Sequence, residues 1–431
     1  MMKAIRPFRN GEKIVCLGDS ITHDGYWLYY LSEYVWSRTG CQVEFINAGV
    51  SGGNSGGGLI RIGYDVIDRR PNRVIVNFGM NDVMRALYNT KTPSSELADK
   101  RAEALERFRE RMTEIVQRLL ENGIDVILMT TLPFDQYDLE NSYAQDLICC
   151  NSEGLARLNE IVRGLSEKFD VSFIDVFTPM TELYSQYPKM RFTLDRVHPE
   201  RFGYLLATAW IVESIYGKQQ NSLSVSPTAT QTDHVSIDAL EFTSSGCQFI
   251  WKPNHIPFHR DAVYQRAASV WDIDLLLNME IWHIGGLPDA RYRVEIGGMD
   301  CGCFSALELQ QGINAMQLHT PLTSVAVNAA ALIKRFNDLD LSLRRLAQCE
   351  LIIHEEHGNP ESEAETKRIL DAYLKAVANS PYAEYYIDVI REYWTLRSDK
   401  ARFAKSRSQV LQSLCNAVRP LACTVKISKT N

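Results

Sequence analysis

Features that would indicate a membrane, nucleic-acid-binding or disulfide-rich protein are missing from this sequence. No stretch is long and apolar enough to span a bilayer, and the basic residues within 1–10 are followed by no apolar segment like that of a signal peptide. No long run of Lys or Arg occurs, and the formal net charge of -7 is spread along the chain. We therefore expect a cytoplasmic protein whose partners are neither nucleic acid nor membrane.

A cysteine framework is also missing. The ten cysteines show no regular spacing of the kind that a set of disulfides would require. Cys149 and Cys150 are adjacent, and Cys301 and Cys303 are separated by one residue, but no second Cys or His pair at a zinc-like spacing accompanies either pair. We interpret the cysteines as reduced thiols packed inside the protein and expect no metal.

Length and composition predict a folded protein with two domains. The 431 residues exceed what one hydrophobic core usually supports, while 45% apolar and 23% charged residues are ordinary for a globular protein. Residues 13–216 alternate short apolar runs with longer segments of helical period, which is the pattern of βαβ units. We expect parallel strands at residues 14–17, 43–46, 74–77, 126–130 and 172–174. Helices on both faces are expected at residues 26–36, 59–67, 95–120, 151–168 and 199–216.

The second half of the chain predicts a different architecture. Residues 218–233 are polar and lose their periodicity, so we expect a linker between a catalytic domain (1–217) and a carboxyl-terminal region (234–431). An antiparallel β sandwich is expected over about 234–323, because β-branched and aromatic residues there alternate with charged ones. Periodicity then predicts helices over about 324–418 and a final strand over about 421–428.

The first predicted strand ends at a candidate nucleophile. The apolar run stops at Gly18, Asp19 and Ser20, where a tight strand-to-helix turn would lift the Ser20 side chain out of the sheet. Ligands of open α/β sheets bind in the crevice beyond the carboxyl ends of the strands. The turn therefore places a hydroxyl where it could attack a substrate.

A base and its carboxylate partner are found at the far end of the α/β region. Asp195 and His198 are three residues apart, so both side chains can point to the same side of a loop or helical turn. The carboxylate could then accept the Nδ1 hydrogen while Nε2 faces the serine. Pro199 follows and is suited to begin the last helix of the region.

Two further strand ends could supply donors to an oxyanion. Residues 43–53 run from a strand into glycines, and without a side chain at Gly52 its backbone N–H could approach a bound oxygen. Residues 74–82 end another strand at Asn81, whose amide could donate to the same oxygen. With the backbone N–H of Ser20, this gives three candidate donors.

Together these four segments resemble the SGNH, or GDSL, hydrolase family. Gly18-Asp19-Ser20, Gly52, Asn81 and the Asp195/His198 pair occur in the order and at the spacing of that family, over roughly the first half of the chain. The resemblance implies a flavodoxin-like three-layer α/β/α sandwich with a parallel sheet and no cofactor. It implies that Ser20 is the nucleophile, that His198 is the general base and then the acid, and that Asp195 orients His198. Ser20, Gly52 and Asn81 would form the oxyanion hole.

The resemblance also implies an activity. Members of this family hydrolyse carboxylic esters, often acetyl groups on sugars, lipids or thioesters. We therefore expect a serine esterase that forms an acyl-enzyme, with an acetylated carbohydrate or another small ester as its substrate. Residues 304–314 and 319–321 are similar to a region appended to bacterial SGNH proteins, in which β structure and then helices follow the hydrolase. Shaping the substrate cleft and forming a homo-oligomer contact both stay open as roles for that region.

Other interpretations of the same residues compete with this one. Residues 49–53 also fit the G-x-S-x-G nucleophile elbow, with Ser51 as nucleophile, although only one strand precedes the strand that leads into it. The glycine-rich run 49–58 could bind a nucleotide, but it lacks both the Lys of a P-loop and the G-x-G-x-x-G spacing. An inactive SGNH-fold carbohydrate-binding module and a lipase or thioesterase of the same fold are the remaining alternatives.

Overall fold

The computed structural model describes residues 3–138, 147–218, 221–380 and 383–430. Its first sheet is parallel and has the strand order β2-β1-β3-β4-β5. The strands are β1 (Lys13–Gly18), β2 (Glu44–Gly49), β3 (Arg73–Asn77), β4 (Asp125–Met129) and β5 (Ser172–Ile174). Their side chains are almost entirely buried, as expected for a parallel sheet covered on both faces.

Helices cover both faces of this sheet. Helices α3, α4 and α5 contact one another in one layer, while α2 and α7 contact each other in the other layer. The helices of this region are α1 (Ser20–His23), α2 (Tyr26–Tyr34), α3 (Ser55–Asp65), α4 (Ser95–Glu121), α5 (Ala156–Phe169), α6 (Phe177–Gln186) and α7 (Arg201–Tyr216). The strand order and the layers confirm the predicted flavodoxin-like three-layer sandwich. The sequence analysis had not predicted α6, which has Pro179 in its first turn.

The predicted linker is wrong as a description of residues 218–233. Two strands, β6 (Asn221–Ser226) and β7 (Ala229–Asp233), lie within that stretch. In β6 only Leu223 and Val225 supply the apolar alternation, and β7 is an exposed strand at a sheet edge, so a polar sequence suits it. How far the two halves of the chain form separate domains stays a prediction.

Two further sheets follow, which confirms the expected β structure. One has the order β13-β10-β6-β7, and the other, fully antiparallel, has the order β12-β11-β14-β9-β8. The pair β6 and β10 is parallel, which differs from the expected all-antiparallel arrangement. The strands are β8 (Val235–Thr243), β9 (Gly246–Pro253), β10 (Glu280–Ile284), β11 (Arg291–Ile296), β12 (Met299–Ser305), β13 (Ile313–Asn314) and β14 (Cys423–Lys429).

Short helices interrupt the β structure and connect it to the first region. Helices α8 (Ala262–Ala268) and α9 (Asp274–Leu277) pack into the hydrophobic core of the parallel sheet rather than into the sandwich core. Tyr264 and Ile273 are fully buried there. The third short helix, α10 (Ala306–Gln311), lies between β12 and β13.

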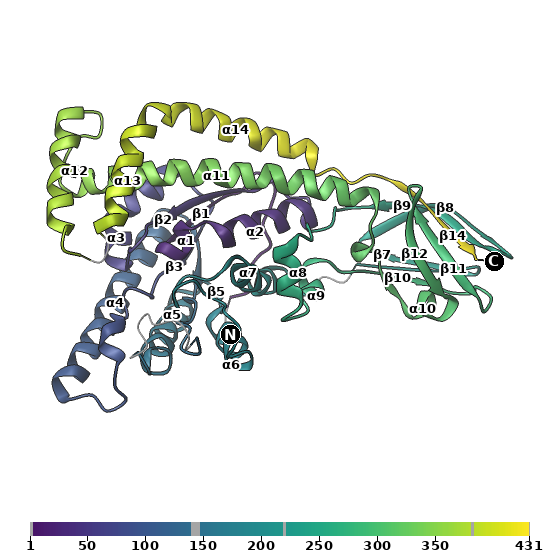
Figure 1. Cartoon of the computed structure of the whole chain (residues 1–431), viewed down its shortest axis with the longest axis horizontal. Coiled ribbons are helices and arrows are strands. Elements are labelled where there is room, and N and C mark those ends of the chain that lie inside the picture. The colour runs from purple at the N-terminus through teal and green to yellow at the C-terminus, as the bar shows by residue number, and fades with distance from the viewer. Residues whose placement is uncertain (1–2, 139–146, 219–220, 381–382, 431) are drawn as a thin grey trace.

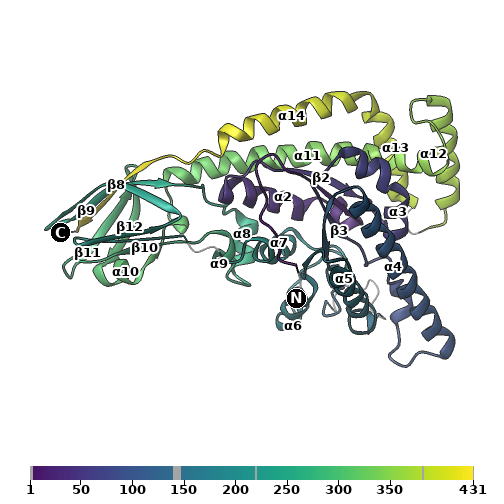
Figure 2. The same cartoon turned by 180° about the vertical axis from the view of Figure 1, so that it is seen from behind.

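Four helices form most of the last quarter of the chain, as predicted. They are α11 (Pro321–Glu355), α12 (Glu363–Val377), α13 (Ala383–Leu396) and α14 (Lys400–Ala417). Helices α11 and α14 lie side by side along the molecule, with the sandwich at one end and α12 and α13 at the other (Figures 1 and 2). Helix α11 also contacts α2 and β2 of the first region. In the described part of the chain no helix is both long and apolar enough to cross a membrane.

Candidate active site

Ser20 is the first residue of α1, directly beyond the carboxyl end of β1. The Asp19 side chain caps this helix by accepting the N–H of Ile21 at 3.0 Å. Gly18 makes the turn possible, because a Cβ there would lie 2.2 Å from Oγ1 of Thr22 and 2.7 Å from the carbonyl oxygen of Asn77. Arg61 fixes the same turn by donating from Nη2 to the Gly18 carbonyl at 2.9 Å.

The structure brings Ser20, His198 and Asp195 into one hydrogen-bonded line. His198 Nε2 lies 2.7 Å from Ser20 Oγ, and His198 Nδ1 lies 2.7 Å from Asp195 Oδ2. The other carboxylate oxygen of Asp195 accepts the backbone N–H groups of Val197 at 3.1 Å and His198 at 2.8 Å. The carboxylate is therefore fixed by its own loop, and it fixes the imidazole in turn.

Arg196 locks the loop that carries the histidine. It has a φ of 67°, a left-handed conformation that is costly for a residue with a side chain. Its buried guanidinium donates from Nε to the Asp135 carbonyl at 2.8 Å and lies over the Phe134 ring, 4.8 Å from the centroid. These contacts offset the local strain. The sequence analysis had missed this role of Arg196.

The charges around His198 favour its protonated form. Burial opposes protonation, but the hydrogen bond and charge of Asp195, with the charges of Asp24 and Asp19, raise the pKa of His198 above its ordinary value. Burial also opposes the charge on Asp195, yet the hydrogen bond and charge of His198 lower the pKa of Asp195 to about 2. An ion pair of imidazolium and carboxylate is thus stabilised here, which is the state that follows proton transfer from Ser20.

Two more carboxyl groups lie close to the line. Burial raises the pKa of Asp19 to about 7, and one of its oxygens, Oδ2, has no hydrogen-bond partner among the residues that the structure describes. Burial likewise raises the pKa of Asp24, which accepts the hydroxyl of Tyr204 at 3.0 Å. The negative charge of each group raises the pKa of His198.

The two candidate oxyanion residues follow the strands on either side of β1. Gly52 lies in the turn after β2 with a φ of +72°, and Asn81 lies in the turn after β3. Because β1 lies between β2 and β3 in a parallel sheet, all three turns meet at one edge. Asn81 Nδ2 donates to the Gly53 carbonyl at 2.7 Å, which joins the two loops and leaves one amide hydrogen for another acceptor.

The alternative nucleophile, Ser51, has different surroundings. No hydrogen bond recorded among the described residues joins Ser51 to a histidine, whereas Ser20 has His198. The side chain of Ser51 instead interacts with the hydroxyl of Tyr385 from α13. The glycine-rich run is also occupied at its helix end, since Asn54 accepts from Gly57 and Asp82 accepts from Ser55 at the first turn of α3. A phosphate would need those same N–H groups.

Two observations bear on the expected absence of metal. Among the residues that the structure describes, no group of three or more His, Cys, Asp and Glu side chains is placed to hold an ion. All ten cysteines are free, with Cys303 exposed and Cys301 partly buried.

A known protein family matches the first half of the chain. Residues 16–206 match the family of GDSL-like lipases and acylhydrolases. This segment is a GDSL-like acylhydrolase domain. The matched residues begin just before Ser20 and end just after His198, so the domain contains the whole hydrogen-bonded line.

Individual proteins were also found to be similar, and one of them covers nearly the whole chain. The chain is 26% identical over 183 residues to the uncharacterized lipoprotein YqeF of Bacillus subtilis (strain 168), covering 39% of this chain and 71% of that protein. A gut microbial diltiazem-metabolizing enzyme is 18% identical and has a TM-score of 0.84, covering 99% of this chain and all of that one. That structure shows the same fold over the whole length. A mutant of an acetylxylan esterase from Geobacillus stearothermophilus, 20% identical over 48% of this chain and 96% of its own, has a TM-score of only 0.39.

Proposed function

We propose that this protein is a serine esterase that hydrolyses carboxylic esters through an acyl-enzyme at Ser20. The single observation that carries the proposal is the hydrogen-bonded line from Ser20 Oγ through His198 to Asp195, inside an acylhydrolase domain. A hydroxyl needs such a base to become a nucleophile. The raised pKa of His198 supports the same role, since the imidazole has to accept and hold the serine proton.

The proposed reaction has two halves. Ser20 Oγ attacks the ester carbonyl while His198 Nε2 takes its proton, and His198 then returns that proton to the departing alcohol, which leaves an acyl-Ser20 ester. A water molecule next gives a proton to His198 and attacks the acyl carbon, and His198 protonates Ser20 as the acid departs. Asp195 stabilises the imidazolium in both halves through its contact with Nδ1.

The negative charge on the carbonyl oxygen needs donors in both halves. We assign this role to the backbone N–H groups of Ser20 and Gly52 and to the amide of Asn81. Their positions after three adjacent strands support the assignment. Loss of one such donor typically costs about 10²-fold to 10³-fold in kcat.

For the substrate we propose an acetyl ester of a carbohydrate. Tyr26, Leu194 and Pro199 help to line a hollow of about 380 Å³ beside the loop that carries His198. The ring of Tyr26 lies against Tyr204 and near the Arg201 guanidinium, and it adds to this lining an aromatic side chain of the kind that sugars contact. Trp27, another aromatic residue near Ser20 in the sequence, is 2% exposed and belongs to the core, so it does not contribute. A panel of acetyl and longer acyl esters, including acetylated oligosaccharides, tests this proposal. Preference for long acyl chains or thioesters would favour the lipase or thioesterase alternative.

Two serine variants test the proposed nucleophile. Ser20→Ala should abolish ester hydrolysis and labelling by a fluorophosphonate, because only an activated hydroxyl reacts with that reagent. Ser51→Ala is the comparison variant and should still label and still hydrolyse esters, with at most the several-fold loss of kcat that removal of its contact with Tyr385 would cause. Hydrolysis lost only in Ser51→Ala would contradict the assignment, and a wild-type protein that neither labels nor hydrolyses esters would favour the inactive binding module.

We further propose a cytoplasmic location. The ten free thiols support it, because exported proteins commonly oxidise such residues to disulfides. The relative from Bacillus subtilis is described as a lipoprotein, which favours export instead. Fractionation of the source cells distinguishes the two, and recovery in the membrane or secreted fraction would contradict this proposal.

A further inference from the structure

The strand that leads to Gly52 lies at the edge of the parallel sheet. One side of β2 pairs with β1, through bonds such as Glu44 N–H to the Glu12 carbonyl and Val50 N–H to the Gly18 carbonyl. Backbone groups of a parallel strand alternate in direction, so those of residues 45, 47 and 49 point away from β1. Within the described ranges, no sixth strand pairs with that side of β2. Buried backbone groups of this kind require partners.

Side chains from the carboxyl-terminal helices supply those partners. Arg407 of α14 donates from Nη2 to the Phe45 carbonyl at 3.0 Å. Asp340 of α11 accepts the Asn47 N–H at 2.9 Å, and Arg344 of α11 donates from Nε to the Gly49 carbonyl. Three alternate residues of the edge strand are thus satisfied by charged side chains from the second half of the chain.

The spacing of side chains along α11 matches the spacing of alternate residues along β2. Asp340 and Arg344 are one helical turn apart, a rise of about 6 Å, and two residues of a strand advance by about 6.6 Å. Gln348 lies a further turn along, and its Oε1 accepts a hydrogen bond of 3.0 Å from the hydroxyl of Tyr385. That hydroxyl also interacts with Ser51. We call Asp340, Arg344 and Gln348 the α11 brace. Asp340 and Arg344 contact residues 47 and 49, and Gln348 is connected through the Tyr385 hydroxyl to Ser51, the residue before Gly52.

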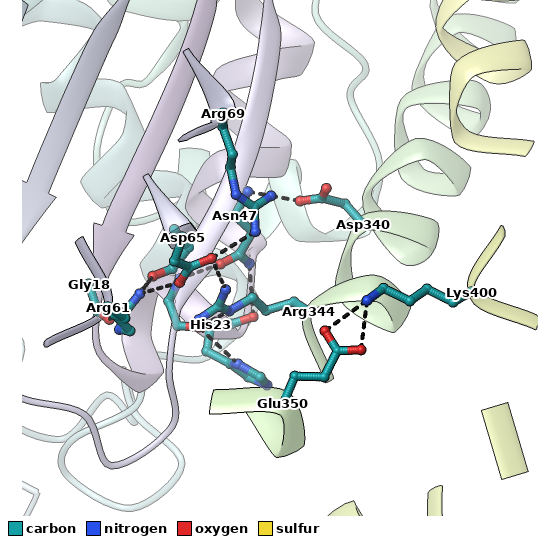
Figure 3. Close-up of polar contacts among 12 residues, drawn as sticks. Gly18, His23, Asn47, Arg61, Asp65, Arg69, Asp340, Arg344, Glu350 and Lys400 are labelled. Carbon is teal, nitrogen blue, oxygen red and sulfur yellow. Dashed lines mark hydrogen bonds and ion pairs between the residues drawn. The ribbon is translucent and has the colours of Figure 1, made fainter. Parts of the chain in front are cut away.

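The brace also reaches the turn that carries Ser20. Arg344 Nη1 contacts Asp65 at 2.7 Å, and Asp65 contacts Arg61 at 2.7 Å (Figure 3). Arg61 in turn donates to the carbonyls of Gly18 and Ala48 at 2.9 and 2.6 Å. Burial opposes the charge on Asp65, but Arg344 and Arg61 hold the pKa of that carboxyl well below its usual range. The Asp65 carboxylate therefore stays negatively charged, and its ion pairs with Arg344 and Arg61 persist, at neutral pH.

We propose that the α11 brace sets the position of the oxyanion donors, with Arg344 as its central positioning residue. This inference rests on the proposed esterase function. Arg344 touches neither Ser20 nor His198 and acts through the backbone of Gly49, three residues before Gly52. Oxyanion donors must lie about 2.7–3.1 Å from the developing charge. A misplacement of about 1 Å can cost about 10²-fold in rate, so a remote contact that fixes this backbone has a large effect on kcat.

The experiment compares two polar contacts of the same helix. Arg344→Gln removes the donor to Gly49 and the contact with Asp65. Glu350→Gln is the matched control, since the Glu350 carboxylate pairs with Lys400 of α14 at 2.6 Å (Figure 3) and has no hydrogen bond to β2 in the described part of the chain. With an activated acetyl ester as the probe, Arg344→Gln should lower kcat about 10-fold to 100-fold and leave KM within about threefold. Glu350→Gln should leave both constants near the wild-type values.

Two further variants separate positioning from folding. Arg344→Lys keeps one donor and should recover part of the lost kcat, because an ammonium can reach either Gly49 or Asp65. Tyr385→Phe removes only the hydroxyl that interacts with Ser51, from a half-buried side chain. It should lower kcat several-fold with an unchanged melting temperature. If Arg344→Gln does not fold, this second variant decides.

The outcomes distinguish the two proposals. Activity that survives Ser20→Ala would overturn the esterase mechanism and the brace with it. Activity that needs Ser20, but for which Arg344→Gln equals Glu350→Gln, would overturn the brace alone. A rise in KM at constant kcat in Arg344→Gln or Tyr385→Phe would also overturn it, because a displaced oxyanion donor weakens transition-state binding rather than substrate binding.

Discussion

The histidine of the candidate site is controlled by a carboxylate three residues away. The imidazole must be neutral to take the proton of Ser20, and Asp195 raises its pKa despite burial. Activity should therefore fall on the acid side at a higher pH than an ordinary histidine would give. The first prediction is that Asp195→Asn moves this acid limb to lower pH and lowers kcat by about 10² or more, while the oxyanion donors keep a residual rate.

A pH profile of kcat/KM checks this prediction. Asp68→Asn is a suitable control, because Asp68 is a carboxylate in the short 3-10 helix Ile67–Arg69 and outside the site. An acid limb that stays at the same pH in Asp195→Asn would show that Asp195 does not set the charge of the imidazole.

The buried carboxyl of Asp19 predicts a pH dependence of stability. Burial raises its pKa from 3.8 to about 7, so the folded protein binds this proton more tightly than the unfolded chain does. Its contribution to the free energy of unfolding is therefore greatest at low pH and is lost as the pH rises through about 7. Asn cannot ionise, so the free energy of unfolding of Asp19→Asn does not fall in this way as the pH rises. The unfolding free energy of the variant relative to wild type should rise by on the order of 2 kcal/mol between pH 5 and pH 8.

Denaturant unfolding at the two pH values measures that difference. Asp195 itself contributes no pH dependence in this range, since its pKa is lowered to about 2 and its stabilisation is lost only in more acid solution. A constant difference between Asp19→Asn and wild type across this range would mean that Asp19 is ionised at pH 5.

At the level of elements, the end of β2 tolerates no side chain. A Cβ on Gly49 would lie 2.2 Å from the backbone nitrogen of His23, three residues after Ser20 and the last residue of α1. Gly49→Ala should therefore push α1 away, with a loss of at least about 2 kcal/mol in unfolding free energy and of most activity. Gly63, in α3, has nothing within 4 Å of its Cβ position, and Gly63→Ala should raise stability by about 0.5–1 kcal/mol. Equal effects of the two changes, measured by thermal unfolding, would contradict this account.

Local signals in the sequence predicted the elements that bury a continuous apolar run. The five parallel strands were predicted to within a few residues, and so were the turns that carry Ser20, Gly52 and Asn81. The same signals failed for β7, whose side chains are all exposed and therefore need no apolar pattern. Exposed edge strands carry little information of that kind.

Contacts between distant segments left no such signal. Arg344 lies in a helix whose periodicity only indicates a core face, and nothing in the sequence says that its guanidinium meets the end of β2. The partner of the β2 edge could be found only from the fold. The line of Ser20, His198 and Asp195 was predictable because each residue sits in a short motif, whereas the α11 brace has no motif beyond a spacing of four.

At the scale of the whole molecule, the last strand lies in the middle of its sheet. Strand β14 pairs with β11 on one side and with β9 on the other. A chain that ends at Arg419 should lose the sandwich, because both neighbours would be left with unpaired edges and an open core. Trp251 and Trp282, which are fully buried there with ring centroids 5.0 Å apart, should become exposed.

Tryptophan emission and the melting temperature report this change. A chain that ends at Lys429 keeps β14 entire and serves as the control. Unchanged emission in the shorter chain would show that the sheet closes without its central strand.

The order of synthesis gives this arrangement a further consequence. The five strands of the parallel sheet leave the ribosome long before β14 does, yet the sandwich sheet has a vacant central position until residues 423–429 emerge. Chains halted before β14 would therefore carry an assembled hydrolase core beside two unpaired strand edges, and such edges are where aggregation and chaperone capture begin.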